Sequence, residues 1–382
     1  MFNGALSQLV LVTRAQELGQ LVRDLNQESI VAVDTESNSL YAYRERVCLI
    51  QFSTPGADYL VDPLSIEDLS PLAAVFRNTD LQKVFHAAEY DLICLRRDYD
   101  FEFANLFDTM IAAGILGREA LGLNALLEAE FNVSLDKRHQ RANWGKRPLS
   151  SQLLSYAQQD THYLLPLRNR LRVELRQRGL WSLATEDFRR LNRAKLNKNG
   201  NGRNGGNEDN AACWRIRGAG DLSPRQAAVL RELCRYREQV AREIDQPLFK
   251  VLGDRTLLAI TEREPEDVRE LRTVPGMSAF LVQRHGAQLV QAVWRGLKAT
   301  PLLPPRQPPP NGQFLARLDK LRGWRKATAQ AMGVKSEVVL PRDLLIGIAA
   351  KNPASMDELS ALMSEVPWRF QQFGADILET LS

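Results

Sequence analysis

Two stretches of this chain cannot build a packed core, and their positions limit how the rest can fold. Asn197 to Asn210 reads NKNGNGRNGGNEDN, which is nearly all asparagine and glycine and predicts a flexible linker. Thr300 to Gly312 reads TPLLPPRQPPPNG and predicts a stiffer, proline-rich spacer. The chain is therefore expected to form three domains, at 1–195, 211–299 and 313–382, with linkers at 196–210 and 300–312.

Composition places the chain among globular proteins, with 44% hydrophobic and 25% charged residues. A net charge of +4 does not by itself mark a nucleic-acid binder, so local clusters of charge must decide that question. The four cysteines show neither CxxC spacing nor a disulfide framework, which favours a reducing, cytoplasmic compartment. The N-terminus lacks a secretion signal, and no apolar run approaches the ~20 residues that a membrane span needs.

The first segment alternates strand and helix patterns, which predicts a mixed sheet flanked by helices. Its expected strands are SIVAVDTE, VCLIQFS, ADYLVD and KVFH. Its expected helices are EYDLICLRRDY, LGLNALLEAEF and one long helix over residues 150–179.

The second and third segments are expected to be all-helical and to repeat each other. An offset of 88 positions pairs Ile260 with Ile348 and Pro265 with Pro353, and it also pairs Arg237 with Arg325. Because no gap is needed over some sixty positions, we interpret the two segments as a duplicated helical domain.

Two acids, Asp34 and Glu36, end the predicted strand SIVAVDTE. Residues two apart in a strand point to the same face, so both carboxylates should project together. Such a pair repels itself unless a cation intervenes, and oxygen ligands suit Mg²⁺ or Mn²⁺. Taken alone, the pattern is common, and two solvated loop acids would be the favoured explanation.

Other acids fall where they could converge on this pair. Asp91 lies in the first turns of a predicted helix that follows a strand, and Tyr156 and Asp160 share one helix face at spacing i, i+4. Each acid taken singly is more simply explained as a surface charge. Four carboxylates and a tyrosine on elements that can converge together indicate a site.

The motifs carry a family resemblance. VAVDTE, HAAEYD and YAQQD resemble the three exonuclease motifs of the DEDD superfamily, and Tyr156 resembles the tyrosine of its DEDDy branch. Residues 141–167 are similar to the stretch that marks ribonuclease D, and the duplicated unit resembles the HRDC domain. The resemblance implies an α/β ribonuclease H-like exonuclease domain followed by two all-α HRDC-like domains.

The resemblance also implies two-metal phosphodiester hydrolysis from RNA 3′ ends, releasing nucleoside 5′-monophosphates. Asp34 would bridge two divalent ions (Mg²⁺ or Mn²⁺), Glu36 and Asp160 would complete the site of the attacking water, and Asp91 would serve the second ion. Tyr156 would position the water, since a pKa near ~10 suits an orienting group better than a base.

Basic clusters are the candidate RNA contacts. Residues 136–148 gather cations around a tryptophan just before the Tyr156 helix, and the third segment opens with a basic helix. A solvated loop with a buried tryptophan is an equally simple reading of the first cluster. The predicted nucleic-acid-binding residues are Lys137, Arg138, Arg141, Trp144, Arg147, Arg322, Arg325 and Lys326.

Several expectations complete this interpretation. The substrate is expected to be RNA, with tRNA precursors favoured by the resemblance, and the protein is expected to be a monomer away from membranes. The rival functions are a DNA 3′→5′ exonuclease of the same superfamily and a catalytically inactive RNA-binding adaptor. Structural roles are preferred for His86 and His162, because hard divalent ions select oxygen ligands.

Overall fold

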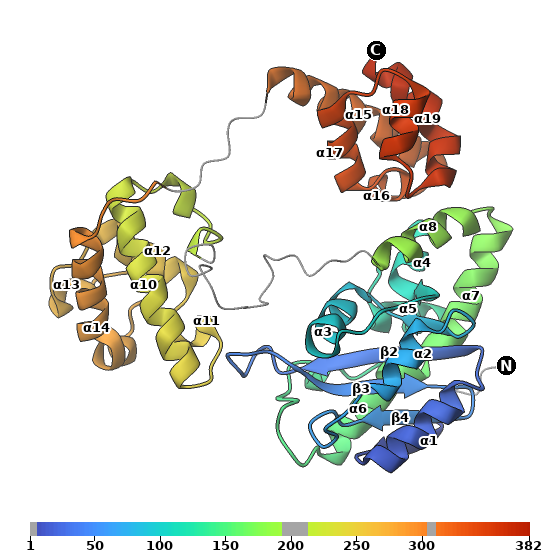
Figure 1. Ribbon diagram of the computed structural model, residues 1–382, viewed down its shortest axis with the longest axis horizontal. Coiled ribbons are helices and arrows are strands. Elements are labelled where there is room, and N and C mark those ends of the chain that lie inside the picture. Colours follow the sequence, from blue (N-terminus) through green and yellow to red (C-terminus); the bar gives the residue numbers. More distant parts are fainter. Residues whose placement is uncertain (1–5, 193–212, 304–310) are drawn as a thin grey trace. The chain divides into compact units, whose positions relative to one another are not determined.

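The computed structural model describes residues 6–192, 213–303 and 311–382 (Figure 1). The expected linker at 196–210 lies outside these residues, as does most of the proline-rich spacer. Backbone proximity divides the chain into two compact units, one formed by 1–37, 47–196 and 309–382 and the other by 38–46 and 197–308.

The N-terminal segment contains a six-stranded mixed sheet in the order β1-β4-β3-β2-β5-β6. Only β3 runs antiparallel to its neighbours, β2 and β4. The pairs β1–β4, β2–β5 and β5–β6 are parallel. The strands are β1 (Gln8–Val12), β2 (Ile30–Ser37), β3 (Val47–Ser53), β4 (Ala57–Val61), β5 (Gln82–Phe85) and β6 (Leu106–Asp108). The predicted mixed sheet is confirmed, and β1 and β6 are additions to it.

Helices cover both faces of the sheet. On one face, α1 (Ala15–Leu25), α2 (Pro71–Arg77) and α3 (Glu89–Tyr99) pack over a core that includes Val31 and Val33. The other face carries Ala32 and is covered by later helices. These are α4 (Thr109–Ile115), α5 (Leu123–Phe131), α6 (Ser151–His162), α7 (Leu164–Gln177) and α8 (Trp181–Leu191). Alternation along β2 therefore points its even-numbered residues toward the later helices.

The single helix predicted over 150–179 is wrong, because two helices are present. Tyr163 ends α6 and also caps α7. Pro166 lies in the first turn of α7, and proline has no backbone N–H to continue the ladder of a preceding helix. The helix that carries Tyr156 and Asp160 is consequently a separate element of 12 residues.

The two helical segments have the same architecture, each with its own core. In the first, the helices are α10 (Pro224–Glu243), α11 (Leu248–Val251), α12 (Asp254–Arg263), α13 (Val268–Arg272) and α14 (Ala279–Lys298). In the second, they are α15 (Gly312–Met332), α16 (Ser336–Val339), α17 (Arg342–Lys351), α18 (Met356–Leu362) and α19 (Pro367–Leu381). Every helix of the first set begins 88 positions before its counterpart, which confirms the predicted repeat.

None of the helices in the described part of the chain is both long enough and apolar enough to span a bilayer.

Candidate active site

The first two acids lie on β2, at the point where its pairing changes. The parallel partner β5 pairs only with Ile30–Ala32, whereas β3 accompanies β2 through Asp34 and Glu36. A register irregularity follows between Glu36 and Ser37. Asp34 and Glu36 share the face of Ala32, so they project toward the side of the sheet that α6 covers.

Asp91 reaches the site through a tight turn between β5 and α3. Ala87 in this turn has a φ of 62°, a left-handed conformation that is unusual for a residue with a Cβ. The buried Asp108 carboxylate accepts hydrogen bonds from the backbone N–H groups of Ala87 (3.2 Å) and Ala88 (2.7 Å). It also caps α4 through Met110 and Ile111. Asp108 thereby fixes the start of the helix that carries Asp91.

Thr35 links the first two motifs directly. Its hydroxyl donates a hydrogen bond to the Asp91 carboxylate. Its backbone N–H donates to Asp34 Oδ1 at 2.9 Å. A threonine between the two acids therefore orients carboxylates from two different elements. Sequence reasoning missed Thr35, which stands within the first motif, and Asp108, which lies outside the motifs that were singled out.

Tyr156 and Asp160 are adjacent on one face of α6. The tyrosine hydroxyl donates a hydrogen bond to the Asp160 carboxylate. The helix begins at a sequence-readable cap, since the Ser150 side chain accepts from the Leu153 backbone N–H.

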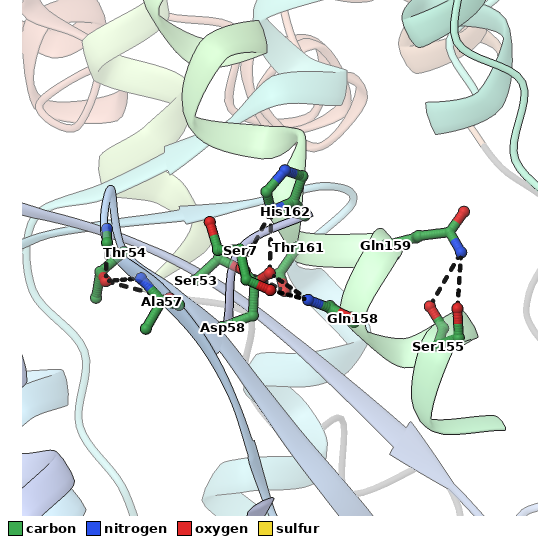
Figure 2. A network of polar contacts seen from close by, with 11 residues as sticks. Ser7, Ser53, Thr54, Ala57, Asp58, Ser155, Gln158, Gln159, Thr161 and His162 are labelled. Carbon is green, nitrogen blue, oxygen red and sulfur yellow. Dashed lines mark hydrogen bonds and ion pairs between the residues drawn. The ribbon is translucent and has the colours of Figure 1, made fainter. Parts of the chain in front are cut away.

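A buried polar network attaches α6 to the sheet (Figure 2). Asp58 on β4 accepts hydrogen bonds from Gln158 Nε2 at 2.7 Å and from His162 Nδ1 at 3.0 Å. Ser53 on β3 bonds the Thr161 hydroxyl at 2.7 Å. Gln158 and His162 stand two positions on either side of Asp160. The network therefore sets the rotation and axial position of α6 from which Asp160 projects.

Electrostatics place the four acids in one site. Burial raises the pKa of the Asp34 carboxyl to about 8, and the Asp160 carboxylate adds to the rise. Burial also raises the pKa of Asp160 to about 7, against the opposing hydrogen bond from Tyr156. Burial and then repulsion from Asp34 raise the pKa of both Glu36 and Asp91 well above their ordinary values. Three buried carboxyls whose pKa is raised by neighbouring carboxylates, with the buried Asp160 beside them, form a site that is short of positive charge.

The donor set fits hard divalent cations, because all four groups are carboxylate oxygens. Within the described residues, none of these acids forms an ion pair with lysine or arginine. As the side chains stand, however, no three His, Cys, Asp or Glu in the described ranges are close enough to hold one ion together. The acids thus interact electrostatically over longer distances than metal ligation allows. Cation binding would have to bring the carboxylates closer together.

A cavity of about 300 Å³ opens beside Tyr156 and Asp160. Between the loop before α6 and the helix itself, it is lined largely by polar groups, including Arg138, His139, Gln152, Ser155 and Gln159. This volume lies at the lower end of the ~300–1,000 Å³ typical of ligand pockets.

The prediction that Trp144 stacks on a base is wrong. The side chain is only 1% exposed and packs with Leu49, Leu60 and Ala157. Arg147 also has a structural role, since it forms a salt bridge with Asp62 at 2.6 Å and donates to the Cys48 carbonyl at 2.7 Å. Trp144 and Arg147 therefore anchor the loop before α6, and Trp144 is corrected to a structural residue.

The other cations of this loop stay candidate RNA contacts. Arg138 is largely exposed beside the cavity and pairs with Asp136. Arg141 is exposed. Lys137 belongs to a short 3-10 helix, Lys137–His139, and its side chain lies outside the described part of the structure.

Arg325 is a further correction. It donates to the Leu340 carbonyl at 3.0 Å, as its repeat counterpart Arg237 does to Leu252 at 3.1 Å. The same arginine thus closes the same turn in both repeats and is a structural residue of the helical fold. Arg322, which pairs with Asp319, and Lys326 are exposed and stay candidates.

The two histidines near the motifs have protein partners. His86 Nδ1 contacts the Thr109 hydroxyl at 2.9 Å, and burial lowers the pKa of His86 to about 4. His162 belongs to the Asp58 network. Both arrangements fit the structural roles that were preferred for them.

Comparison with known proteins supports each part of the chain. A family model described as 3′-5′ exonuclease matches residues 9–176, and the HRDC domain matches residues 226–293 and 314–381. Ribonuclease D of Desulfotalea psychrophila is 30% identical over 75% of this chain and 75% of its own length. Ribonuclease D of Haemophilus influenzae is 32% identical over 74% of this chain and 69% of its own length.

Longer relatives share the same core. Protein RRP6-like 3 of Arabidopsis thaliana is 33% identical over 69% of this chain, and the match spans 31% of that protein. The chain thus spans about a third of the length of the RRP6-like relatives.

Solved structures agree with the fold. The crystal structure of Escherichia coli RNase D, an exoribonuclease involved in structured RNA processing, matches with a TM-score of 0.71 at 25% identity, covering 98% of both chains. The catalytic core of RRP6 from Trypanosoma brucei matches with a TM-score of 0.62 at 30% identity, covering 76% of this chain and 80% of that one. With its exonuclease core and duplicated HRDC domain, the chain belongs to the ribonuclease D family.

Proposed function

We propose that this protein is a metal-dependent 3′→5′ exoribonuclease that releases nucleoside 5′-monophosphates. The observation that carries the proposal is that four buried carboxylates, from β2, α3 and α6, lie within electrostatic range of one another, with the Tyr156 hydroxyl bonded to one of them, Asp160. The family matches to ribonuclease D and RRP6 support the same activity.

Two divalent ions, Mg²⁺ or Mn²⁺, would supply an activated water and stabilise the leaving 3′-oxygen. Asp34, which stands between the other acids, is proposed as the bridging ligand. Glu36 and Asp160 complete the water site, and Asp91, held by Thr35, serves the second ion. Each carboxylate would have to be deprotonated to serve as a ligand.

Tyr156 is proposed to position the attacking water. Burial, reinforced by the charge of Asp160, raises the pKa of its hydroxyl far above the ordinary value. The hydroxyl therefore stays protonated at neutral pH, where it donates to Asp160 and accepts from a water. It orients the nucleophile and does not deprotonate it.

The substrate is proposed to be the 3′ end of RNA, with tRNA precursors as the physiological class. The terminal nucleotide would enter the cavity beside Tyr156 and Asp160, and Arg138, which lines this cavity, would meet the phosphate backbone. Lys137 and Arg141 are proposed as further RNA contacts. On the second repeat, Arg322 and Lys326 would add a tethering contact. We further propose that the protein is monomeric and acts in the cytoplasm.

Digestion of matched oligonucleotides tests this function. RNA with a free 3′-hydroxyl should be shortened to 5′-monophosphates when Mg²⁺ or Mn²⁺ is present. RNA with a blocked 3′ end should persist, and so should free RNA in EDTA.

A DNA oligonucleotide of the same sequence belongs in the same assay. Faster digestion of DNA than of RNA would support the DNA exonuclease instead. A protein that binds RNA but degrades neither RNA nor DNA, with or without metal ions, would support the inactive adaptor.

A further inference from the structure

Gln51 on β3 has an unusual environment. Its side chain is fully buried, at 0% exposure. Neither Oε1 nor Nε2 has a hydrogen-bond partner among the described residues. Leaving a buried polar group unpaired destabilises the fold, so native proteins do so rarely and usually for a function.

The sheet register shows what the amide faces. Gln51 stands directly opposite Asp34 in the β2–β3 ladder and opposite Leu60 in the β3–β4 ladder. Directly opposed residues point to the same face, with Cβ atoms about 5 Å apart. Gln51 therefore lies beside Asp34 on the α6 side of the sheet, with an apolar leucine on its other flank.

The remaining neighbours cannot serve the amide. On the same face of β3, Leu49 is apolar, and Ser53 is already bonded to Thr161 and Asp58. Ala157 of α6, which packs with Leu49 and Leu60 in the same cluster, is apolar. The Asp34 carboxylate, whose Oδ1 accepts from the Thr35 backbone, is the polar group directly beside Gln51 on the neighbouring strand.

A second buried glutamine in the same interface shows the contrast. Gln158 is 5% exposed, and its Nε2 donates to Asp58 at 2.7 Å and to the Ser7 carbonyl at 2.9 Å. Where an amide only attaches α6 to the sheet, the structure supplies its partners. Gln51, which stands opposite Asp34, has no such partner in the described part of the chain.

We propose that Gln51 is a positioning residue for Asp34, whose amide N–H holds the carboxylate plane while Oε1 accepts from a water bound at the same site. The assignment rests on the proposed function, since it is the metal-bound, ionised Asp34 that needs this donor. Partners of metal ligands of this kind typically contribute about 10- to 100-fold to metal affinity.

The test compares Gln51→Met and Gln51→Leu with Leu60→Met in the full-length chain. Mn²⁺ is titrated calorimetrically into metal-free protein without RNA, and thermal unfolding is followed in EDTA. Both Gln51 variants should bind Mn²⁺ about 10- to 100-fold more weakly. They should unfold in EDTA at or above the wild-type temperature, because an unpaired amide has been replaced by an apolar group of similar size. Leu60→Met, on the other side of Gln51, should keep wild-type Mn²⁺ affinity.

Two results would overturn the assignment while leaving the proposed function intact. One is wild-type Mn²⁺ affinity in both Gln51 variants. The other is a fall in their unfolding temperature in EDTA, which would make Gln51 a packing residue. A wild-type protein that neither binds Mn²⁺ nor degrades RNA would instead overturn the proposed function, and this assignment with it.

Discussion

At Asp34 and Asp160, burial removes water that would solvate the charge and so raises the pKa of both carboxyls. The pKa of Asp34 rises to about 8, with repulsion from Asp160 adding to the effect, and the pKa of Asp160 rises to about 7. The folded, metal-free protein consequently holds protons that the unfolded chain releases. A site of this kind is less stable without its cation, and its cation must displace protons to bind.

A pH dependence follows from these raised pKa values. The unfolded carboxyls titrate near ~4, so the stability contribution of the site is present below that pH and is lost as pH rises toward about 8. We expect the unfolding temperature of wild-type protein in EDTA to fall, relative to an Asp34→Asn/Asp160→Asn double variant, between these limits. Thermal unfolding at a series of pH values checks this. Parallel curves for the two proteins would contradict it.

Substitution of single site residues separates chemistry from folding. Asp34→Asn or Asp160→Asn should leave the protein folded and reduce metal-dependent cleavage about a thousandfold or more, since each removes an anionic ligand. Steady-state cleavage of a short RNA, with thermal unfolding as the control, measures both. Substantial activity in either variant would refute the ligand assignment.

Tyr156→Phe removes only the hydroxyl. It should lower kcat about 10- to 100-fold while KM changes little, because an orienting contact is lost and the substrate contacts remain. Matched kcat and KM values for the variant and wild type would reduce Tyr156 to a packing residue.

At the scale of elements, α6 depends on a polar network within a largely apolar helix–sheet contact. Apolar surfaces tolerate small slides, whereas the bonds from Asp58 to Gln158 and His162 require one register. Such buried polar networks cost desolvation but specify geometry when every member is satisfied. Asp160 is therefore aimed by residues that do not take part in the chemistry.

Asp58→Asn should weaken this attachment. An asparagine offers one acceptor oxygen and opposes an N–H donor to Gln158 or His162, so the free energy of unfolding should fall by about 1–3 kcal/mol. The kcat for a short RNA, measured well below the unfolding temperature, should fall as well. Asp68→Asn, at an exposed acid that accepts hydrogen bonds from Ser70, is the matched control and should change neither. An Asp58→Asn protein with lowered stability but wild-type kcat would show that the network does not position Asp160 for catalysis.

The strength of each local pattern decided which elements could be predicted. The strands β2 and β3 and the helix α3 follow from apolar runs and their flanking residues, and their bounds match the sequence expectation closely. The strands β1 and β6 were missed, because five and three residues carry little periodicity and gain their stability from neighbouring strands. The break at Tyr163 was missed because leucines continue at helical spacing on both sides of it.

The site shows the same division. Asp34, Glu36, Asp91, Tyr156 and Asp160 stood in motifs and could be singled out. Gln51 and Asp58 could not, because their importance arises from strand register across the sheet. The tryptophan at 144 was misjudged for the opposite reason, since surrounding cations suggest exposure although the ring is buried.

At the scale of the whole molecule, duplication is the simplest source of the helical segments. The equivalent arginines Arg237 and Arg325 donate to carbonyls 15 positions further along in each copy. The offset was visible in the sequence because the two copies have the same spacing throughout. The sequence does not show which surface residues contact RNA, because exposed cations follow no sequence pattern that would identify them.

Removing both helical segments tests their contribution. A chain ending at Ala211 should lose activity on structured RNA while keeping cleavage of short oligonucleotides, because the tethering contact raises local substrate concentration without supplying chemistry. The ratio of the two rates, compared with that of the full chain, is the measurement. Equal losses on both substrates would count against tethering.

The central claim is that acids from three separate elements hold paired divalent ions. Anomalous diffraction at the manganese edge, from crystals grown with Mn²⁺ and a nucleoside 5′-monophosphate, tests it most directly. We predict two manganese peaks among Asp34, Glu36, Asp91 and Asp160, with the nucleotide phosphate between them and Tyr156 alongside. Acids that remain apart with no manganese among them, in crystals of protein that still degrades RNA, would contradict the claim.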